Sequence, residues 1–127
     1  MSTKSAVLYG FFSGFGIDAY EENSVYSLAN PPEFPYITYE NKTDAFADNG
    51  TSISFSLWFR STSWVTAHAL ADEISEYIGQ GGRVLPCDGG NIWIKRAQPF
   101  AQDMGDQADD MIKRVYCMLN VSFNTLD

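Results

Sequence analysis

The sequence contains few residues that could carry out acid–base or nucleophilic chemistry. His68 is the only histidine, so any histidine-based catalysis must use it. It lies between Ala67 and Ala69 in a predicted helix rather than in a loop, with no identifiable partner. A nucleophilic Cys–His pair with Cys87 or Cys117 stays open, although Cys117 falls in a predicted strand and is interpreted as a core residue. We therefore predict no catalytic residue and no enzymatic activity.

Motifs that bind nucleotides, metals or acyl groups are missing from the sequence. It has no G-x-x-x-x-G-K-[ST], H-E-x-x-H, C-x-x-C or G-x-S-x-G pattern. The glycines of "GFFSGFG", residues 10–16, follow a stretch of helical period rather than a strand. We interpret this segment as a packing face with a helix cap and expect no cofactor.

A group of acids near the C-terminus could in principle bind a cation through carboxylate oxygens. Its members are Asp103, Asp106, Asp109 and Asp110. Their spacing lacks the D-x-[DN]-x-[DN]-G pattern and its terminal Glu, so we expect no metal. The segment 99–110 is predicted to be a solvated acidic loop that faces a neighbouring protein or a DNA channel.

Length and composition favour one small soluble domain spanning residues 1–127. Three Trp, seven Tyr and nine Phe are more rings than a core of this size can hide, so several should lie in grooves or interfaces. The net charge of −8 argues against binding nucleic acid through its phosphates. We expect no membrane segment and no signal peptide, synthesis in a cytoplasm, and two buried free thiols at Cys87 and Cys117.

Hydrophobic periodicity predicts two helices and five strands. Leu8, Phe11, Phe12 and Phe15 form one helical stripe, and Ile53, Phe55, Leu57 and Phe59 alternate with serines as in a half-buried strand. The predicted helices are 3–15 and 63–79, and the predicted strands are 35–42, 51–60, 83–87, 92–98 and 111–124.

Turn and cap signals connect these elements. "DNG" at 48–50 and "DGGN" at 88–91 predict hairpins, and Gly81 or Gly82 should end the second helix. Residues 17–34 are predicted to be a long loop. The last strand is long enough to run past its neighbours, where it could pair with another chain.

The predicted order is α-β-β-α-β-β-β. It indicates an α+β fold in which two helices pack on one face of a mainly antiparallel sheet.

The order of elements resembles a class of viral proteins. A short helix leads to "AYEENSVYSLANPPEFPYITYE", then to a hairpin and to a helix of the kind "WVTAHALADEISEYI". This is similar to the small tail-terminator, tail-completion and minor-capsid proteins of long-tailed bacteriophages and prophages.

The resemblance implies a virion structural protein made in a bacterial host. Such a subunit forms a homo-oligomeric ring of six that caps the tail tube at its head-proximal end and joins it to the head connector. DNA would pass through the ring without specific binding. A neck or head-completion protein bound to the connector is the alternative within the class. A different alternative is a small enzyme or ligand-binding domain with a pocket near Trp58, Trp64 and Trp93.

The stiff segment "PPEFPYITYE", residues 31–40, suggests where assembly contacts lie. Prolines reduce the freedom of the loop before docking, so less ordering entropy is lost on binding. The aromatic residues that follow would supply contact area. The predicted assembly surface consists of Pro31, Pro32, Phe34, Tyr36, Asp103, Asp106, Asp109 and Asp110.

Overall fold

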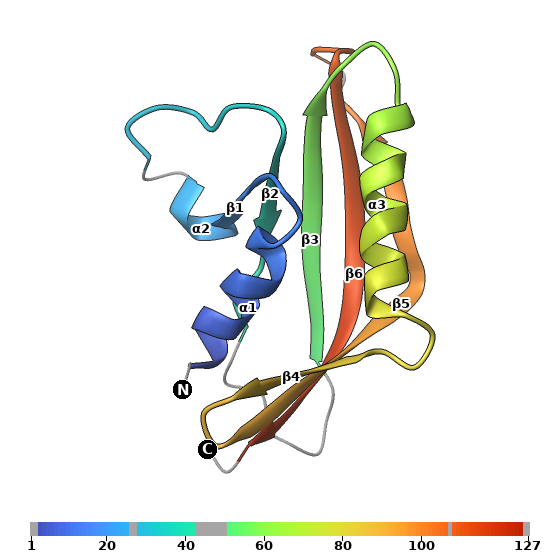
Figure 1. The fold of residues 1–127 in the computed structure, drawn as a ribbon. Coiled ribbons are helices and arrows are strands. Elements are labelled where there is room, and N and C mark those ends of the chain that lie inside the picture. Colours follow the sequence, from blue (N-terminus) through green and yellow to red (C-terminus); the bar gives the residue numbers. More distant parts are fainter. Residues whose placement is uncertain (1–2, 26–27, 43–50, 107, 126–127) are drawn as a thin grey trace.

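The computed structural model describes residues 3–25, 28–42, 51–106 and 108–125, which build a six-stranded sheet (Figure 1). Its strand order is β1-β2-β3-β6-β5-β4. The strands are β1 (Asp18–Glu21), β2 (Tyr36–Tyr39), β3 (Thr51–Arg60), β4 (Arg83–Cys87), β5 (Gly90–Gly105) and β6 (Ile112–Thr125). Among these described strands, only β1 and β2 pair in parallel. The predicted α+β fold with a mainly antiparallel sheet is confirmed.

Two helices, α1 (Lys4–Ser13) and α3 (Val65–Ile78), cover one face of this sheet. The ring of Phe12 on α1 stacks on Tyr39 and touches Phe55, whereas α3 lies over β3, β5 and β6. The core lies between these layers, and its largest fully buried side chains are Phe12, Phe55, Phe123, Leu8, Ile37, Ile53, Leu57, Ile74, Ile78, Ile92, Ile94 and Leu119.

Local signals explain where the helices begin and end. The Thr3 hydroxyl accepts a hydrogen bond from the Ala6 backbone N–H at 3.2 Å, and Gly14, within the segment 10–16 that was predicted to hold a helix cap, caps the end of α1. Helix α3 ends at Ile78, within one residue of the predicted range 63–79, but its cap is Gly79 rather than Gly81 or Gly82. Gly79 directly follows the last buried residue and adopts a φ of +77°, a conformation that favours glycine.

The predicted loop 17–34 is wrong in part, because it contains β1 and the one-turn helix α2 (Glu22–Val25). β1 pairs with β2 in register Asp18↔Tyr36. A four-residue strand with one buried side chain, Ala19, is too short to show a period in the sequence. Its structure depends on β2, which joins it only after the chain has folded back.

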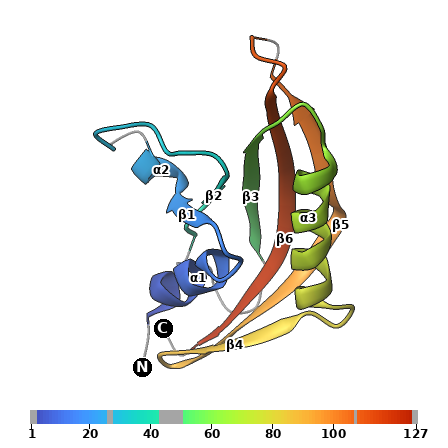
Figure 2. The same ribbon diagram turned by 45° about the horizontal axis from the view of Figure 1, so that its top comes forward.

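The structure also corrects the predicted acidic loop. β5 continues to Gly105, so only the end of segment 99–110 is a connection, and the pairing with β6 is irregular between Arg96 and Ala101. The hairpin of β5 and β6 therefore reaches beyond the end of β3 (Figure 2).

The last strand runs past β3, whose pairing with it stops at Val121, but not past β5, and its pairing with another chain stays a prediction. β6 is interior, pairing with β3 over residues 112–121 and with β5 over 113–125. The sheet edges are instead β1, which has four residues, and β4, which contains Pro86. Short edges and proline both discourage strand addition by another chain.

The two predicted hairpin turns have different outcomes. The turn at 88–91 is confirmed, since Cys87 pairs with Gly90. A Cβ on Gly90 would lie 1.9 Å from the Asn124 carbonyl oxygen, so glycine is required for the close approach to β6. β2 and β3 pair as an antiparallel hairpin, but the predicted turn at 48–50 lies outside the described residues. Within the described chain, no helix is both long and apolar enough to cross a membrane.

Candidate assembly surface

The residues that could do nucleophilic chemistry are separated or inert in the fold. His68 is exposed; its Nε2 donates to the Asp103 carboxylate at 2.8 Å, and its ring stacks on Trp64. Both cysteines are buried and unpaired. Burial raises the pKa of the Cys117 thiol to about 12 and also raises that of Cys87. Thiols held protonated in this way are poor nucleophiles.

The four acids of the predicted assembly surface do not form one cluster. Asp103 lies on the helix-covered face, against His68. Asp106 accepts hydrogen bonds from the backbone of the turn that follows it, at the N–H groups of residues 108 and 109. Within the described residues, no group of three or more His, Cys, Asp or Glu could hold a metal ion.

Asp109 joins the end of β3 to the start of β6. Its carboxylate accepts from the Met111 backbone N–H at 2.9 Å and from Arg60 at 2.5 Å. Both hydrogen bonds lower the pKa of the Asp109 carboxyl, and the one from the Met111 backbone has the larger effect. The acids at 106 and 109 therefore order the connection between β5 and β6, and Asp110 remains exposed beside them.

The face of the sheet opposite the helices carries a continuous row of aromatic rings and one arginine. We call these residues, Tyr20, Tyr36, Trp58, Arg114 and Tyr116, the aromatic row. Tyr36 stacks on Trp58 with ring centroids 5.9 Å apart and meets Tyr20 edge to face at 6.1 Å. The Arg114 guanidinium lies 4.7 Å from the Trp58 centroid and 5.4 Å from that of Tyr116.

Hydrogen bonds fix the orientation of this row. Trp58 Nε1 donates to the Thr38 hydroxyl at 2.8 Å, and Arg114 Nε donates to the Ser56 hydroxyl at 3.0 Å. Burial raises the pKa of Tyr36, and the nearby Arg114 charge opposes that shift only in part. The rings are half-buried, so they keep surface available for a partner. Half-buried Trp, Tyr and Arg side chains are the types that dominate binding energy in protein interfaces.

The structure brings part of the predicted surface to this row. Phe34 contacts Tyr36 at 5.3 Å, which places the proline loop at the end of the sheet where β3 finishes and β6 begins. Asp106 lies at the same end and lines a depression of about 370 Å³ with Trp58 and Arg114. Pro31 is exposed and Pro32 half-buried. The loop and the hairpin turn thus flank one end of the aromatic row.

Four members of the row, Tyr20, Trp58, Arg114 and Tyr116, were not predicted as part of the assembly surface. The alternation of β3 places Trp58 on the face of the serines, and the alternation of β6 places Arg114 and Tyr116 opposite Cys117. The alternation within each strand is therefore enough to place each residue on this face. The pairing Trp58↔Arg114, which brings the residues together, is a tertiary feature.

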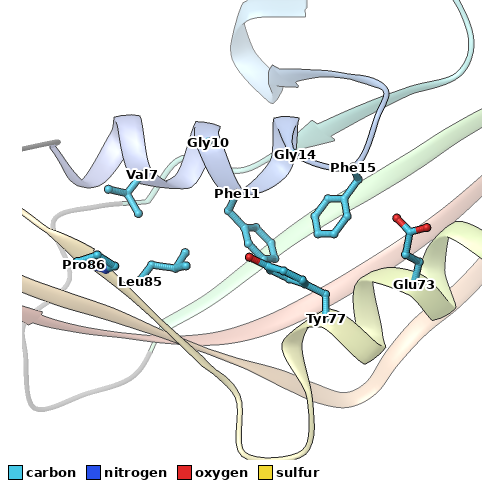
Figure 3. Close-up of a pocket in the computed structure, with 9 residues that line it drawn as sticks. All are labelled: Val7, Gly10, Phe11, Gly14, Phe15, Glu73, Tyr77, Leu85 and Pro86. Atoms are coloured by element: carbon cyan, nitrogen blue, oxygen red, sulfur yellow. The ribbon is translucent and has the colours of Figure 1, made fainter.

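A second hollow, of about 420 Å³, lies on the other face between α1, α3 and β4 (Figure 3). Its walls are mostly apolar or aromatic, and Glu73 is the only acid among the described residues that line it. The lining residues are Val7, Gly10, Phe11, Gly14, Phe15, Glu73, Tyr77, Leu85 and Pro86.

The three tryptophans do not line a common pocket, contrary to the ligand-binding alternative. Trp58 pairs with Arg114, and Trp93 pairs with Ser122, eight residues further along β6. At about 3.3 Å per residue these positions are roughly 26 Å apart. Trp64 packs on His68 at the start of α3.

No protein-family model matches this sequence, and no curated protein matches it. A solved structure does share the fold. It is a chain from the virion of a native gene transfer agent (GTA) particle, with a TM-score of 0.61. The likeness covers 94% of this chain and 93% of that chain, at 16% sequence identity.

At 16% identity the likeness establishes a common fold. It extends over nearly the full length of both chains, so the sheet, α1 and α3 are included rather than one motif. A fold can serve many functions, and the function must be argued from the surfaces of this chain.

Proposed function

We propose that this chain is a structural protein of a phage-like virion and acts as its tail terminator. In this role it forms a ring of six that caps the tail tube at the head-proximal end, joins it to the head connector and lets DNA pass. The whole-chain likeness to a chain of the GTA virion is the observation that carries the proposal. That particle is phage-like, and the likeness agrees with the resemblance seen in the sequence.

The surfaces of the chain support a role in assembly. The aromatic row offers rings and a cation without an overlying helix, and the loop at Pro31 and Pro32 flanks it. We assign this end of the sheet to contact with a neighbouring virion protein, either the tail tube or the connector. Catalysis has little support, because the buried thiols are held protonated and His68 is paired with Asp103.

The proposal is tested by imaging particles from a producer strain that lacks the gene. A terminator stops tail growth, so its loss should give overlong tails that carry no heads. Loss of a neck protein should instead give tails of normal length without heads. Normal particles would contradict both roles. Supplying the gene from a plasmid is the control, and restored tail length is expected.

The size of the assembly provides a second measurement. Six copies of the 14.2-kDa chain have a mass of about 85 kDa, which light scattering can measure in solution, and negative stain can show the ring directly. A chain that stays monomeric in solution and is absent from purified particles would contradict the proposal.

Replacing Pro31 and Pro32 together with glycine should weaken attachment to the particle. Glycine widens the conformations open to the free loop, so more entropy is lost on docking. At about 0.4–1 kcal/mol per site, incorporation should fall roughly four- to thirty-fold. Thermal unfolding of the purified chain should change little, because Pro31 is exposed and neither residue belongs to the core. Unchanged incorporation in a competition with the natural chain would show that loop stiffness is unimportant.

A further inference from the structure

The hollow between α1, α3 and β4 has the size and lining to bind a side chain of another protein chain. Gly10 of α1 and its C-cap Gly14 line the hollow about one helical turn apart, and a Cβ at Gly10 would meet nothing within 4 Å. Phe11, Phe15 and Tyr77 form its aromatic wall, with ring centroids 5.4–6.1 Å apart (Figure 3). We call this hollow the α1–α3 pocket.

Glu73 gives the α1–α3 pocket a charge preference. Its carboxylate lies at the margin of an otherwise apolar hollow, near Phe15 (Figure 3). Within the described residues it forms no ion pair. A partner that combines apolar surface with a cation would fit both parts of the pocket.

The chain itself presents such a group on the hairpin of β4 and β5. Val84 and Trp93 are cross-strand neighbours on the uncovered face, 57% and 37% exposed. Lys95 Nζ lies 4.2 Å from the Trp93 ring centroid, and Lys95 forms no ion pair in the described part of the chain. We call Val84, Trp93 and Lys95 the hairpin knob.

The hairpin knob is held in place by the backbone beneath it. Trp93 Nε1 donates to the Gly81 carbonyl oxygen at 3.0 Å. A Cβ on Gly82 would lie 2.7 Å from both Trp93 Nε1 and Lys95 Cγ, so these side chains pack on bare backbone. A prearranged apolar group loses little entropy on binding.

We infer that the hairpin knob of one copy docks into the α1–α3 pocket of the next copy, with Lys95 facing Glu73. Apolar surface then meets apolar surface, and Glu73 and Lys95, which form no ion pair within the described chain, have opposite charges. The inference rests on the proposed function and deepens it, because it names the contact between neighbouring subunits.

The placement of the two patches favours a ring or filament over a two-fold dimer. Val84 of the knob and Leu85 of the pocket are adjacent on β4, so they point to opposite faces of the sheet. Two copies therefore cannot fill both pockets at once. Each contact leaves one pocket and one knob free, and such head-to-tail contacts close into a ring when the rotation allows it.

Charge exchange provides the test. Glu73→Lys and Lys95→Glu should each lower association between copies at least about tenfold, because like charges then meet in the contact. The double variant carries both changes in every copy and should recover association to within about threefold of the natural chain. Association is measured by sedimentation velocity of the purified full chain and by copies retained on isolated tails.

Matched variants control for charge and folding. Asp72→Lys makes the same charge change on the neighbouring exposed position of α3, and Lys42→Glu does so on a lysine remote from the knob. Neither should alter association. Val84→Arg is a further probe, because this side chain is mostly exposed and its replacement should block docking without disturbing the core.

The outcomes separate this inference from the proposed function. If the chain is found on tails and sets their length, but the double variant is no better than the single variants, the contact is wrong and the function stands. If tails are normal without the gene, the proposed function is wrong. The association of the single and double charge variants in sedimentation velocity still shows whether the hairpin knob docks into the α1–α3 pocket. Single variants that behave like Asp72→Lys, or a chain that never self-associates on tails or in solution, would overturn the inference.

Discussion

Replacing Phe12 with alanine is expected to lower the free energy of unfolding by about 3–5 kcal/mol. The Phe12 side chain is fully buried and joins α1 to the sheet, stacking on Tyr39 at 4.5 Å and contacting Phe55 at 5.1 Å. Truncation removes the buried ring and leaves a cavity that flanking strands cannot collapse to fill. Urea unfolding followed by circular dichroism measures the change.

Tyr9→Ala is the matched control for this effect. Tyr9 is the adjacent residue on the same helix, but it is 52% exposed. Its truncation should change the free energy of unfolding by about 0.5 kcal/mol or less, as surface substitutions usually do. Equal losses for the two variants would mean that α1 does not dock through Phe12. The comparison also tests whether α1, which carries an internal glycine at Gly10, depends on packing rather than on helix propensity.

The elements that could be predicted from sequence are those whose period is visible along the chain. Apolar residues alternate with polar ones along most of β3, although Ser56 is also buried, and the stripe of α3 recurs at Ala67, Ala71, Ile74 and Ile78. These patterns are local consequences of the geometry of a strand and a helix. They gave the element types and the layered arrangement correctly.

The parts that failed depend on partners distant in the chain. β1 exists because β2 offers it a parallel neighbour, and the end of β5 is extended because β6 lies beside it. Residues such as Asp103 and Gly105 are typical of loops, so their local preference indicated a loop. Pairing with a long interior strand overrides that preference.

The candidate assembly surface was likewise predicted only in part. The proline loop and Tyr36 were predicted, because proline restricts backbone freedom wherever it occurs. The aromatic row was not, since it forms only when β1, β2, β3 and β6 align in register. Asp103 was grouped with the other acids by sequence distance, yet the alternation of β5 turns it toward His68 on the opposite face.

Replacing Trp58 with alanine should have the largest effect on assembly. Its ring lies at the centre of the aromatic row, between Tyr36 on one side and Arg114 on the other. Central Trp residues in interfaces commonly contribute 2 kcal/mol or more, so incorporation into particles should fall by about thirty-fold or more. Competition between variant and natural chains in one producer strain, quantified on purified particles, measures the loss.

Two further measurements separate this assembly effect from a folding effect. Trp58 is half-buried and outside the core, so the purified variant should keep its circular dichroism spectrum and unfold in one transition. Ser52→Ala on the same strand and face, at the far end from Arg60, should assemble normally. If Trp58→Ala assembles as well as Ser52→Ala, the aromatic row is not an interface. The rings would then only stabilise the packing of β2, β3 and β6. In that case Trp58→Ala would lower thermal stability without lowering incorporation into particles.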